Sequence, residues 1–329
     1  MAEPLWIRQA ADLGRSLGFS VKAHEPMSRH TSFKVGGPAD VLADPSEPEH
    51  VRALRSFALR VDAAFTVIGA GTNIIVRDGG IRGVVCRIGP AMSRVTVNRR
   101  DLELTVQGGA LVRRVCLEAA DASLSGIEWA IGIPGTVGGA VCMNAGAHGG
   151  CMADVVIEAL TIGPDAGLRT WAHDEIGFGY RTTALQGTGH VVLEVKLTLA
   201  MGHEASIRAR HEEILALRRD SQPLDLPSAG SVFKRPHGDY AGRLIEAAGL
   251  KGTARVGGAM VSDKHAGFIV NTGNATAADV IALVEHVRDR VREHSGVTLE
   301  TEVLVLGEDW LPPLPMGEGW GEGRRKGPP

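Results

Sequence analysis

The stretch GIEWAIGIPGTVGGAVCMNAGAHG, residues 126–149, decides which folds the chain can adopt. Glycine and other small residues recur in it too densely for either a helix or a strand. Glycine also lacks the Cβ atom that would hold a ligand away from the backbone, so loops of this kind often cradle diphosphate groups. Gly132, Gly135, Gly138 and Gly139 fit this description, and Pro134 fixes one turn. We therefore predict a loop that lets a phosphate-bearing ligand approach the backbone.

Two other interpretations of this stretch have to be weighed. Residues 129–147 carry no charge and are long enough to cross a membrane, but five glycines and a proline argue against a transmembrane helix. A close-packed structural turn without a ligand stays open on this stretch alone.

The composition of the chain narrows the class of protein. With 329 residues the chain is too long for one simple core, and 43 glycines against 14 aromatic residues favour a loop-rich architecture of helices and strands. A net charge of −3 gives no overall field that would attract nucleic acid or an anionic membrane. The N-terminus has no secretion signal, and the four cysteines show no metal-binding spacing. We expect a cytoplasmic protein with reduced cysteines, no metal, and no nucleic-acid or membrane partner.

A second glycine turn lies in the segment IGAGTNIIV, residues 68–76. Residues 65–68 read as a buried strand that runs directly into Gly69 and Gly71, the start of a G-x-G pattern. Ile74 stands where a Rossmann fingerprint needs its third glycine, and a β-branched run follows in place of a helix. The segment therefore predicts a strand, a glycine turn and a second strand, in which a nucleotide would meet bare backbone amides on a different fold.

The remaining elements follow from hydrophobic periodicity and capping signals. Further strands are expected over residues 74–76, 84–88, 95–97, 102–106, 155–162, 190–199, 268–270 and 303–306. Helices are expected over residues 4–19, 46–58, 111–120, 207–219, 240–250 and 276–295, with Gly296 just past the end of the last one. Ser46 with Glu49, and Thr276 with Asp279, form candidate capping boxes, and residues 24–27 read as a turn. The strand-rich part ends near residue 200, and a smaller α+β unit follows it.

Five blocks of sequence, in this order, resemble one protein family. The blocks are HTSFKVGG (30–37), IGAGTNIIV (68–76), GIPGTVGGAVCMNAGAHG (132–149), GYRTT (179–183), and PSAGSVFKRP (227–236) followed by HAGFIVN (265–271) and LETEV (299–303). Any one glycine block would be weak, but the combination over roughly residues 24–307 is similar to the UDP-N-acetylenolpyruvoylglucosamine reductases, flavin enzymes of bacterial peptidoglycan synthesis.

The resemblance implies a fold class and a division into domains. The fold is expected to be α+β, with a two-lobed FAD-binding domain of the vanillyl-alcohol-oxidase (PCMH) type and a smaller α+β substrate-binding domain. The expected parts are an N-terminal helix and lead-in at 1–29, the FAD-binding domain at 30–200, the substrate-binding domain at 201–309 and a disordered tail at 310–329. The two FAD-binding lobes are expected at about 30–64 and 65–200.

The resemblance also implies a reaction and its cofactors. The family reduces an enolpyruvyl ether on a UDP-sugar to a lactyl ether, with NADPH as reductant and FAD as the bound cofactor. Its catalytic residues fall on Arg181, Ser231 and Glu302. Arg181 can donate to the substrate carboxylate, Glu302 can do so only if a raised pKa keeps it protonated, and Ser231 would deliver a proton to carbon.

Two further sets of residues follow from the resemblance. Cofactor contacts are expected at Gly69, Ala70, Gly71, Thr72, Asn73, Gly132, Ile133, Pro134, Gly135, Thr136, Gly138, Gly139 and Asn144. Substrate contacts are expected at Lys234, Arg235 and His265. The partners are then a nucleotide sugar and NADPH, and a monomer is expected.

Without the resemblance, each catalytic assignment would be modest. Ser231 in a Pro-Ser-Ala-Gly-Ser segment is typical of a turn, and Glu302 is typical of a surface charge at a strand end. Arg181 near a strand end is usually a solvated charge, and His265 could be a core histidine. The basic residues between 234 and 265 could form a solvated face.

The chain departs from the family pattern at three places. Arg235 stands where asparagine often follows the Phe-Lys pair, and Thr183 replaces a common serine. The short distance from Tyr180 to the strand expected at His190 leaves no room for the tyrosine-bearing loop of some members. The chain therefore resembles the shorter class of the family.

Two rival functions remain at this level. A flavin-dependent alcohol or hydroxy-acid oxidase could share the FAD-binding fold, but the blocks after residue 201 speak against it. A non-catalytic nucleotide-binding or regulatory protein could keep the glycine loops. Retention of Arg181, Ser231 and Glu302 together discriminates against it, because a binding protein needs no acid pair.

Overall fold

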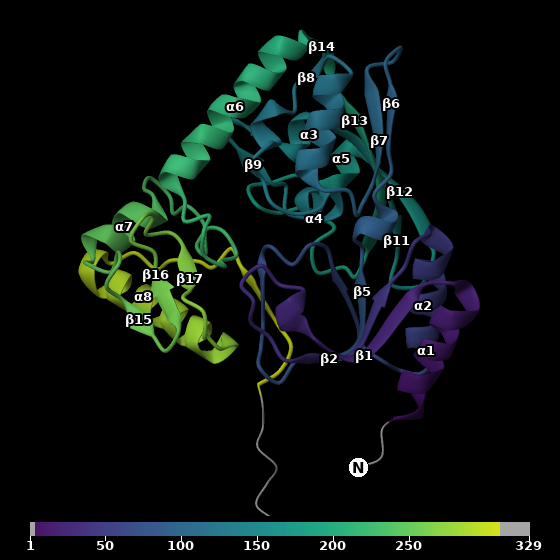
Figure 1. Cartoon of the computed structure of the whole chain (residues 1–329), viewed down its shortest axis with the longest axis horizontal. Helices are drawn as coiled ribbons and strands as arrows, with labels where there is room; N and C mark the ends of the chain where they lie inside the picture. The colour runs from purple at the N-terminus through teal and green to yellow at the C-terminus, as the bar shows by residue number, and fades with distance from the viewer. Residues whose placement is uncertain (1–3, 310–329) are drawn as a thin grey trace, which may run out of the picture.

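The computed structural model of the chain describes residues 4–309, so the tail expected at 310–329 lies outside the described residues. Two bodies of unequal size are visible in Figure 1, and the long helix α6 (Glu204–Ser221) runs from the larger body to the smaller one. Among the described residues, no helix is long and apolar enough to cross a membrane. The four cysteines are free thiols.

The helices other than α6 are α1 (Leu5–Leu17), α2 (Pro48–Arg60), α3 (Val112–Asp121), α4 (Val137–Cys142), α5 (His173–Ile176), α7 (Ala241–Ala247) and α8 (Ala277–Ser295). The strands up to residue 107 are β1 (Ser20–Pro26), β2 (Pro38–Asp44), β3 (Phe65–Ile68), β4 (Ile74–Val76), β5 (Ile81–Arg87), β6 (Val95–Asn98) and β7 (Glu103–Gln107). The later strands are β8 (Leu124–Ser125), β9 (Gly146–Ala147), β10 (Gly150–Cys151), β11 (Val156–Ile162), β12 (Leu168–Ala172), β13 (Val191–Thr198), β14 (Ala200–Met201), β15 (Arg255–Val256), β16 (Ala259–Val261), β17 (Ile269–Asn271) and β18 (Leu304–Leu306).

The first sheet has the strand order β1-β2-β5-β3. Strand β1 is antiparallel to β2, whereas β5 is parallel to both β2 and β3. Helices α1 and α2 pack on this sheet through buried residues such as Ile7, Leu54 and Phe57.

The turn expected at residues 24–27 is largely wrong, because residues 20–26 form β1. The sheet also extends to Arg87, so it does not divide at the lobe boundary expected near residue 64.

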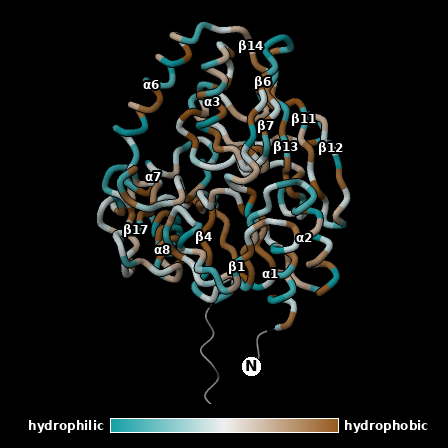
Figure 2. The backbone as a smooth tube through the Cα atoms, turned by 45° about the vertical axis from the view of Figure 1, so that its right-hand side comes forward, coloured by the Kyte–Doolittle hydropathy of each residue, from teal (hydrophilic) through white to brown (hydrophobic). Residues whose placement is uncertain are grey.

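The second sheet has the order β12-β11-β13-β7-β6, and all of its pairs are antiparallel. The alternating run expected at residues 190–199 forms the central strand β13, whose Val191, Val195 and Leu197 are fully buried. Helices α3 and α4 lie against this sheet, and their apolar residues share one core with it. Figure 2 shows hydrophobic (brown) segments along these strands, whereas α6 alternates between hydrophilic and hydrophobic segments.

The smaller body contains the sheet β15-β16-β17, covered by α7 and α8. Helix α8 begins with the expected capping box, in which the Thr276 side chain accepts from Asp279 N. After α8 the chain returns to the larger body, where β18 pairs in parallel with β4. This return is the yellow strand in Figure 1. It places the end of the described chain beside the first glycine turn.

Two local expectations are wrong. Helix α2 begins with Pro48 after Glu47, and Ser46 does not cap it, because the Ser46 hydroxyl bonds to the His50 ring instead. The central stretch also contains regular structure, namely α4 and the short strands β9 and β10. Tertiary hydrogen bonds from Val137 N and Gly138 N to the 108–110 segment compensate for the low helix propensity of glycine there.

Candidate functional site

The two glycine turns predicted from the sequence meet in space. A Cβ atom added to Gly69 would lie 2.3 Å from Thr136 Oγ1, and one added to Gly135 would lie 2.9 Å from Thr72 Oγ1. The Thr72 hydroxyl donates to the Pro134 carbonyl at 3.4 Å. Side chains at either glycine would push the two turns apart, so glycine is needed for their contact as well as for access to the backbone.

The first turn offers a row of unused donors. The backbone amides of Ala70, Gly71, Thr72 and Asn73 donate to no acceptor within residues 4–309. Gly71 has a φ of +68°, and a Cβ atom there would lie 2.0 Å from the His30 carbonyl oxygen, so only glycine fits. Successive free amides in such a turn form a concave site for an anion. The turn therefore fits the diphosphate of a dinucleotide cofactor.

A cavity of about 240 Å³ lies beside this turn. Its lining residues are Arg29, His30, Thr31, Ser32, Lys34, Gly69, Ala70, Arg87, Gly89, Pro90, Gly109, Leu111 and Thr136. Lys34 adds positive charge next to the free amides, whereas Arg87 and Arg29 are paired with Asp44 and Glu25. A lysine at this place suits a phosphate-bearing ligand. A second cavity, of about 300 Å³, lies where α6 ends, but none of the predicted site residues lines it.

Sequence reasoning assigned no role to Arg29, Lys34, Arg87 or Gly109. The block HTSFKVGG and the double glycine at 108–109 were the available signals, since both break the regular pattern of strands and helices. These residues come from separate segments, and only the fold brings them to one cavity.

The other predicted cofactor residues lie in different surroundings. Gly132 lies against α6, because a Cβ atom there would be 2.4 Å from Arg218 Cδ. Gly138 donates its amide to the Gly108 carbonyl at 2.8 Å. Gly139 has open space, since its Cβ would meet nothing closer than 3.6 Å. Asn144 uses its side chain on the protein itself, as a donor to Gly179 O and an acceptor from Ala153 N.

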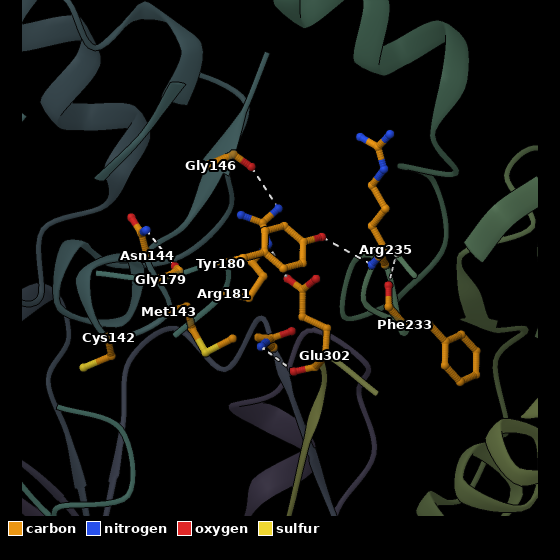
Figure 3. A network of polar contacts seen from close by, with 12 residues as sticks. Cys142, Met143, Asn144, Gly146, Gly179, Tyr180, Arg181, Phe233, Arg235 and Glu302 are labelled. Carbon is orange, nitrogen blue, oxygen red and sulfur yellow. Dashed lines mark hydrogen bonds and ion pairs between the residues drawn. The ribbon is translucent and has the colours of Figure 1, made fainter. Parts of the chain in front are cut away.

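Two of the predicted catalytic residues form an ion pair. Arg181 Nε lies 3.1 Å from Glu302 Oε1, and both side chains are largely buried. Arg181 Nη2 also donates to the Gly146 carbonyl at 2.9 Å (Figure 3). The contact with Glu302 does not have hydrogen-bond geometry, so the buried Nε–H has no hydrogen-bond acceptor within the described residues. Arg181 Nη1 also donates to no acceptor within the described residues, and unlike Nε it is not enclosed, so Nη1 is the donor that remains for a ligand.

Burial and the neighbouring positive charges shift the pKa of the Glu302 carboxyl in opposite directions. Burial raises the pKa of the Glu302 carboxyl, and the positive charges of Arg181 and then Lys234 work against that shift. Burial prevails, so the pKa lies above its ordinary value. A carboxyl group with a raised pKa can act as a hydrogen-bond donor or an acid nearer to neutral pH.

Ser231 lies on the backbone segment next to Glu302. The amide of Glu302 donates to the Val232 carbonyl at 2.8 Å, and the Ser231 hydroxyl donates to the Phe233 carbonyl at 3.2 Å. Ser231 and His265 both border Gly267, because a Cβ atom there would lie 3.3 Å from Ser231 Oγ and 3.0 Å from His265 Cε1. Burial lowers the pKa of His265, which favours its neutral form.

The predicted substrate residues Lys234 and Arg235 have partners of their own. Lys234 Nζ lies 3.3 Å from Glu300 Oε2, a solvent-exposed pair. The Arg235 amide donates to the Tyr180 hydroxyl at 3.3 Å, and its guanidinium stacks 4.0 Å above the Tyr240 ring. In Figure 3 the Arg235 side chain points away from the Arg181–Glu302 pair. The structure thus brings Arg181, Glu302 and the Ser231 segment together, and leaves the Arg235 guanidinium outside this group.

Comparison with known proteins gives matches over most of the chain. Residues 39–170 match the family model of an FAD binding domain, and residues 222–306 match that of the UDP-N-acetylenolpyruvoylglucosamine reductase C-terminal domain. The chain is 45% identical over 294 residues to UDP-N-acetylenolpyruvoylglucosamine reductase 2 of Symbiobacterium thermophilum, covering 89% of this chain and 94% of that protein. It is 43% identical over 289 residues to the reductase of Syntrophomonas wolfei, covering 88% of this chain and 96% of that protein.

A solved structure gives the same result. The crystal structure of the UDP-N-acetylenolpyruvylglucosamine reductase from Thermus caldophilus is similar with a TM-score of 0.76 and 37% sequence identity. The similarity covers 88% of this chain and 100% of that one. The expected fold class, an FAD-binding domain of the PCMH type in an α+β chain, is confirmed.

Proposed function

The chain belongs to the UDP-N-acetylenolpyruvoylglucosamine reductase family, and on this premise we propose that it makes UDP-N-acetylmuramate for peptidoglycan synthesis. The substrate is the enolpyruvyl ether of UDP-N-acetylglucosamine, and the reductant is NADPH. Membership of the family makes the protein an FAD-dependent oxidoreductase. We assign the substrate-binding part to the expected domain at residues 201–309, which includes the matched residues 222–306.

The cofactor is assigned to the two glycine turns and the cavity beside them. The free amides at residues 70–73 would hold the diphosphate of FAD, and Lys34 in the cavity lining would balance part of its charge. FAD supplies the hydride for the vinyl carbon when it is bound. The turns themselves contribute backbone N–H donors, and their glycines place no side chain in the way of the cofactor.

Arg181 and Glu302 are assigned to the substrate carboxylate. Once the vinyl carbon has gained a hydride, negative charge builds up on the neighbouring carbon and spreads onto the carboxylate. Donors that already point at that charge lower the barrier, because they need no reorganisation. The Nη1 amino group of Arg181, which has no acceptor within the described residues, is such a donor on a positively charged guanidinium. Glu302 in its protonated form would add a second donor.

Ser231 is assigned the proton that completes the reduction. The carbon beside the carboxylate becomes strongly basic, so a hydroxyl held close to it can transfer a proton. The Ser231 hydroxyl is held by the Phe233 carbonyl, and the neutral form of His265 lies nearby. The Ser231 oxygen is left with negative charge until solvent reprotonates it.

Lys234 is assigned to the phosphate groups of the substrate. Its partner Glu300 is 76% exposed, and ion pairs between such exposed groups are weak. The ammonium can therefore exchange that partner for a phosphate at little cost. His265 and Arg235 are assigned to the same nucleotide, Arg235 through a different contact from the asparagine that it replaces.

The observation that carries this proposal is the contact between Arg181 and Glu302, which come from sequence positions 121 residues apart and meet at 3.1 Å. The test uses purified full-length protein loaded with FAD. We expect bleaching of the yellow flavin absorbance by NADPH and steady-state NADPH oxidation only when the enolpyruvyl substrate is added. A colourless protein that refuses FAD, or flavin that simple alcohols reduce and NADPH does not, would overturn it.

A further inference from the structure

Arg181 occupies a backbone conformation that residues with a side chain rarely adopt. Its φ is +55°, in the left-handed region that favours glycine. It lies with Tyr180 at the tip of a tight turn, which is closed by Gly179 N donating to Thr182 O at 2.9 Å. A conformation of this kind persists only where the surroundings hold it.

Asn144 holds the first arm of this turn. Its side-chain Nδ2 donates to the Gly179 carbonyl at 2.8 Å, and its Oδ1 accepts from Ala153 N at 3.0 Å (Figure 3). Asn144 is only 7% exposed, and both ends of its amide are used. The orientation of the amide is therefore fixed, and with it the position of the Gly179 carbonyl.

Gln186 holds the turn from the other side. Its Nε2 donates to the Arg181 carbonyl at 3.1 Å and to the Cys142 carbonyl at 2.9 Å. Cys142 is the last residue of α4, two positions before Asn144. The hydrogen bonds of Asn144 and Gln186 therefore both connect the end of the central glycine stretch to the turn that carries Arg181.

We propose that Asn144 is a positioning residue for Arg181, assisted by Gln186. Asn144 thus acts on the substrate side of the reaction, whereas the sequence suggested that it contacts the cofactor. The segment that follows the cofactor turn sets the guanidinium between Gly146 O and Glu302 through these two amides. This inference rests on the proposed function, because it needs Arg181 to bind the substrate.

The first test replaces Asn144 with aspartate in the full-length, FAD-loaded protein. Asn144→Asp keeps the acceptor for Ala153 N but turns a second oxygen toward the Gly179 carbonyl. The turn therefore loses the hydrogen bond that Asn144 Nδ2 donates to this carbonyl. We expect flavin reduction by NADPH to stay within about twofold of the parent. Reoxidation by the enolpyruvyl substrate should slow about a hundredfold and its KM should rise, because small misplacements of a substrate-binding group are costly.

The second test separates positioning from a general structural role. In an Arg181→Met background there is no guanidinium to position, so Asn144→Asp should slow single-turnover reoxidation by no more than about twofold further. A full additional loss in that background would overturn the inference. Gln186→Glu should behave like Asn144→Asp, whereas Gln186→Lys keeps a donor for the two carbonyls and should retain most of the rate.

The outcomes distinguish this inference from the function on which it rests. If the parent protein does not turn over the enolpyruvyl substrate, the proposed function fails. If the parent is active and Asn144→Asp reoxidises at the parent rate, the positioning role fails alone. If Asn144→Asp does not bind FAD, the variants of the exposed Gln186 decide whether the positioning role holds. The same two rates are compared in them, flavin reduction by NADPH and reoxidation by the enolpyruvyl substrate.

Discussion

The side-chain amide of Asn73 donates a hydrogen bond of 3.2 Å to the backbone carbonyl of Glu302. The Asn73 carbonyl in turn accepts from Leu304 N at 3.0 Å, where β18 begins beside β4. The last residue of the first glycine turn is thereby attached to the segment that carries Glu302. A change in the turn should consequently affect both the cofactor site and the carboxyl group.

Gly71→Ala is expected to damage this turn. The new Cβ would lie 2.0 Å from the His30 carbonyl oxygen at a φ of +68°, and neither backbone segment can move without disturbing the other. Overpacking together with left-handed strain should cost about 2–5 kcal/mol of unfolding free energy and weaken FAD binding. Thermal unfolding and a fluorescence titration with FAD measure the two effects.

Gly296→Ala is the matched control for that change. Gly296 has a φ of +73° after α8, and nothing lies within 4 Å of its added Cβ. Only the left-handed strain of about 1–2 kcal/mol should appear, with FAD affinity unchanged. Equal losses of FAD affinity in the two variants would contradict the role given to the turn.

Ser231→Ala is expected to separate the two half-reactions. The variant should bind FAD and accept hydride from NADPH at the parent rate, because no group near the cofactor turns has changed. Reoxidation by the enolpyruvyl substrate should slow by a factor of about a hundred to ten thousand, the usual cost of losing a general acid. Stopped-flow absorbance of the flavin measures both steps. Ser228→Ala in the same segment is the control, and an unchanged second step in Ser231→Ala would refute the assignment.

Glu302→Gln is expected to retain more activity than Glu302→Ala. The glutamine amide can still donate to the substrate carboxylate, as protonated Glu302 is proposed to do, whereas alanine leaves a cavity beside Arg181. We expect a difference of about tenfold or more in steady-state turnover, which corresponds to one charge-assisted hydrogen bond. Equal losses in both variants would rule out a donor role for this position.

The pH dependence of turnover should reflect the protonation of the Glu302 carboxyl. Burial raises the pKa of Glu302, so its protonated form persists to higher pH than that of an ordinary glutamate. Activity that needs this form is complete below the raised pKa and falls as the pH rises through it. In Glu302→Gln the fall should vanish from a plot of kcat/KM against pH. A fall at the same pH in both proteins would assign it to another group.

Much of the fold could be predicted because its signals are local. The alternation along β13, the glycine turn after β3 and the capping box at Thr276 each lie within a few residues of sequence. Strand β1 could not be predicted in this way, since most of its residues are exposed and show no alternation. Helix α4 depends on hydrogen bonds to the 108–110 segment, which no local pattern reveals.

The candidate site could be predicted only in part. Glycine density marked both turns, but nothing within GYRTT or LETEV indicates that Arg181 and Glu302 meet; that expectation came from the family resemblance alone. The cavity beside the first turn combines residues from distant segments, such as Arg29, Arg87 and Gly109. Arg29 follows β1 and Arg87 ends β5 in the first sheet, whereas Gly109 follows β7 of the second sheet, so only the packing of the two sheets brings them to one cavity. The catalytic roles of the three residues stay predictions until the variants are measured.

His211 is a buried histidine of α6, and its two ring nitrogens have no hydrogen-bond partner within residues 4–309. Burial lowers the pKa of this ring; Glu128 works against the shift, and Arg208 adds to it. Because the folded state resists protonation, the stability that depends on neutral His211 is complete above its ordinary pKa of about 6.5 and is lost as the pH falls below it.

His211→Leu should therefore weaken the acid sensitivity of the fold. Leucine has no charged form and removes the unpaired ring nitrogens, so the variant should match or exceed the parent by about 1 kcal/mol near neutral pH, and its advantage should grow as the pH falls. Urea unfolding midpoints across that range measure this difference. His286→Leu, at an exposed position of α8, is the matched control, because it replaces a histidine without changing the buried face of a helix. A parallel decline in His211→Leu and the parent would show that other groups cause the acid sensitivity.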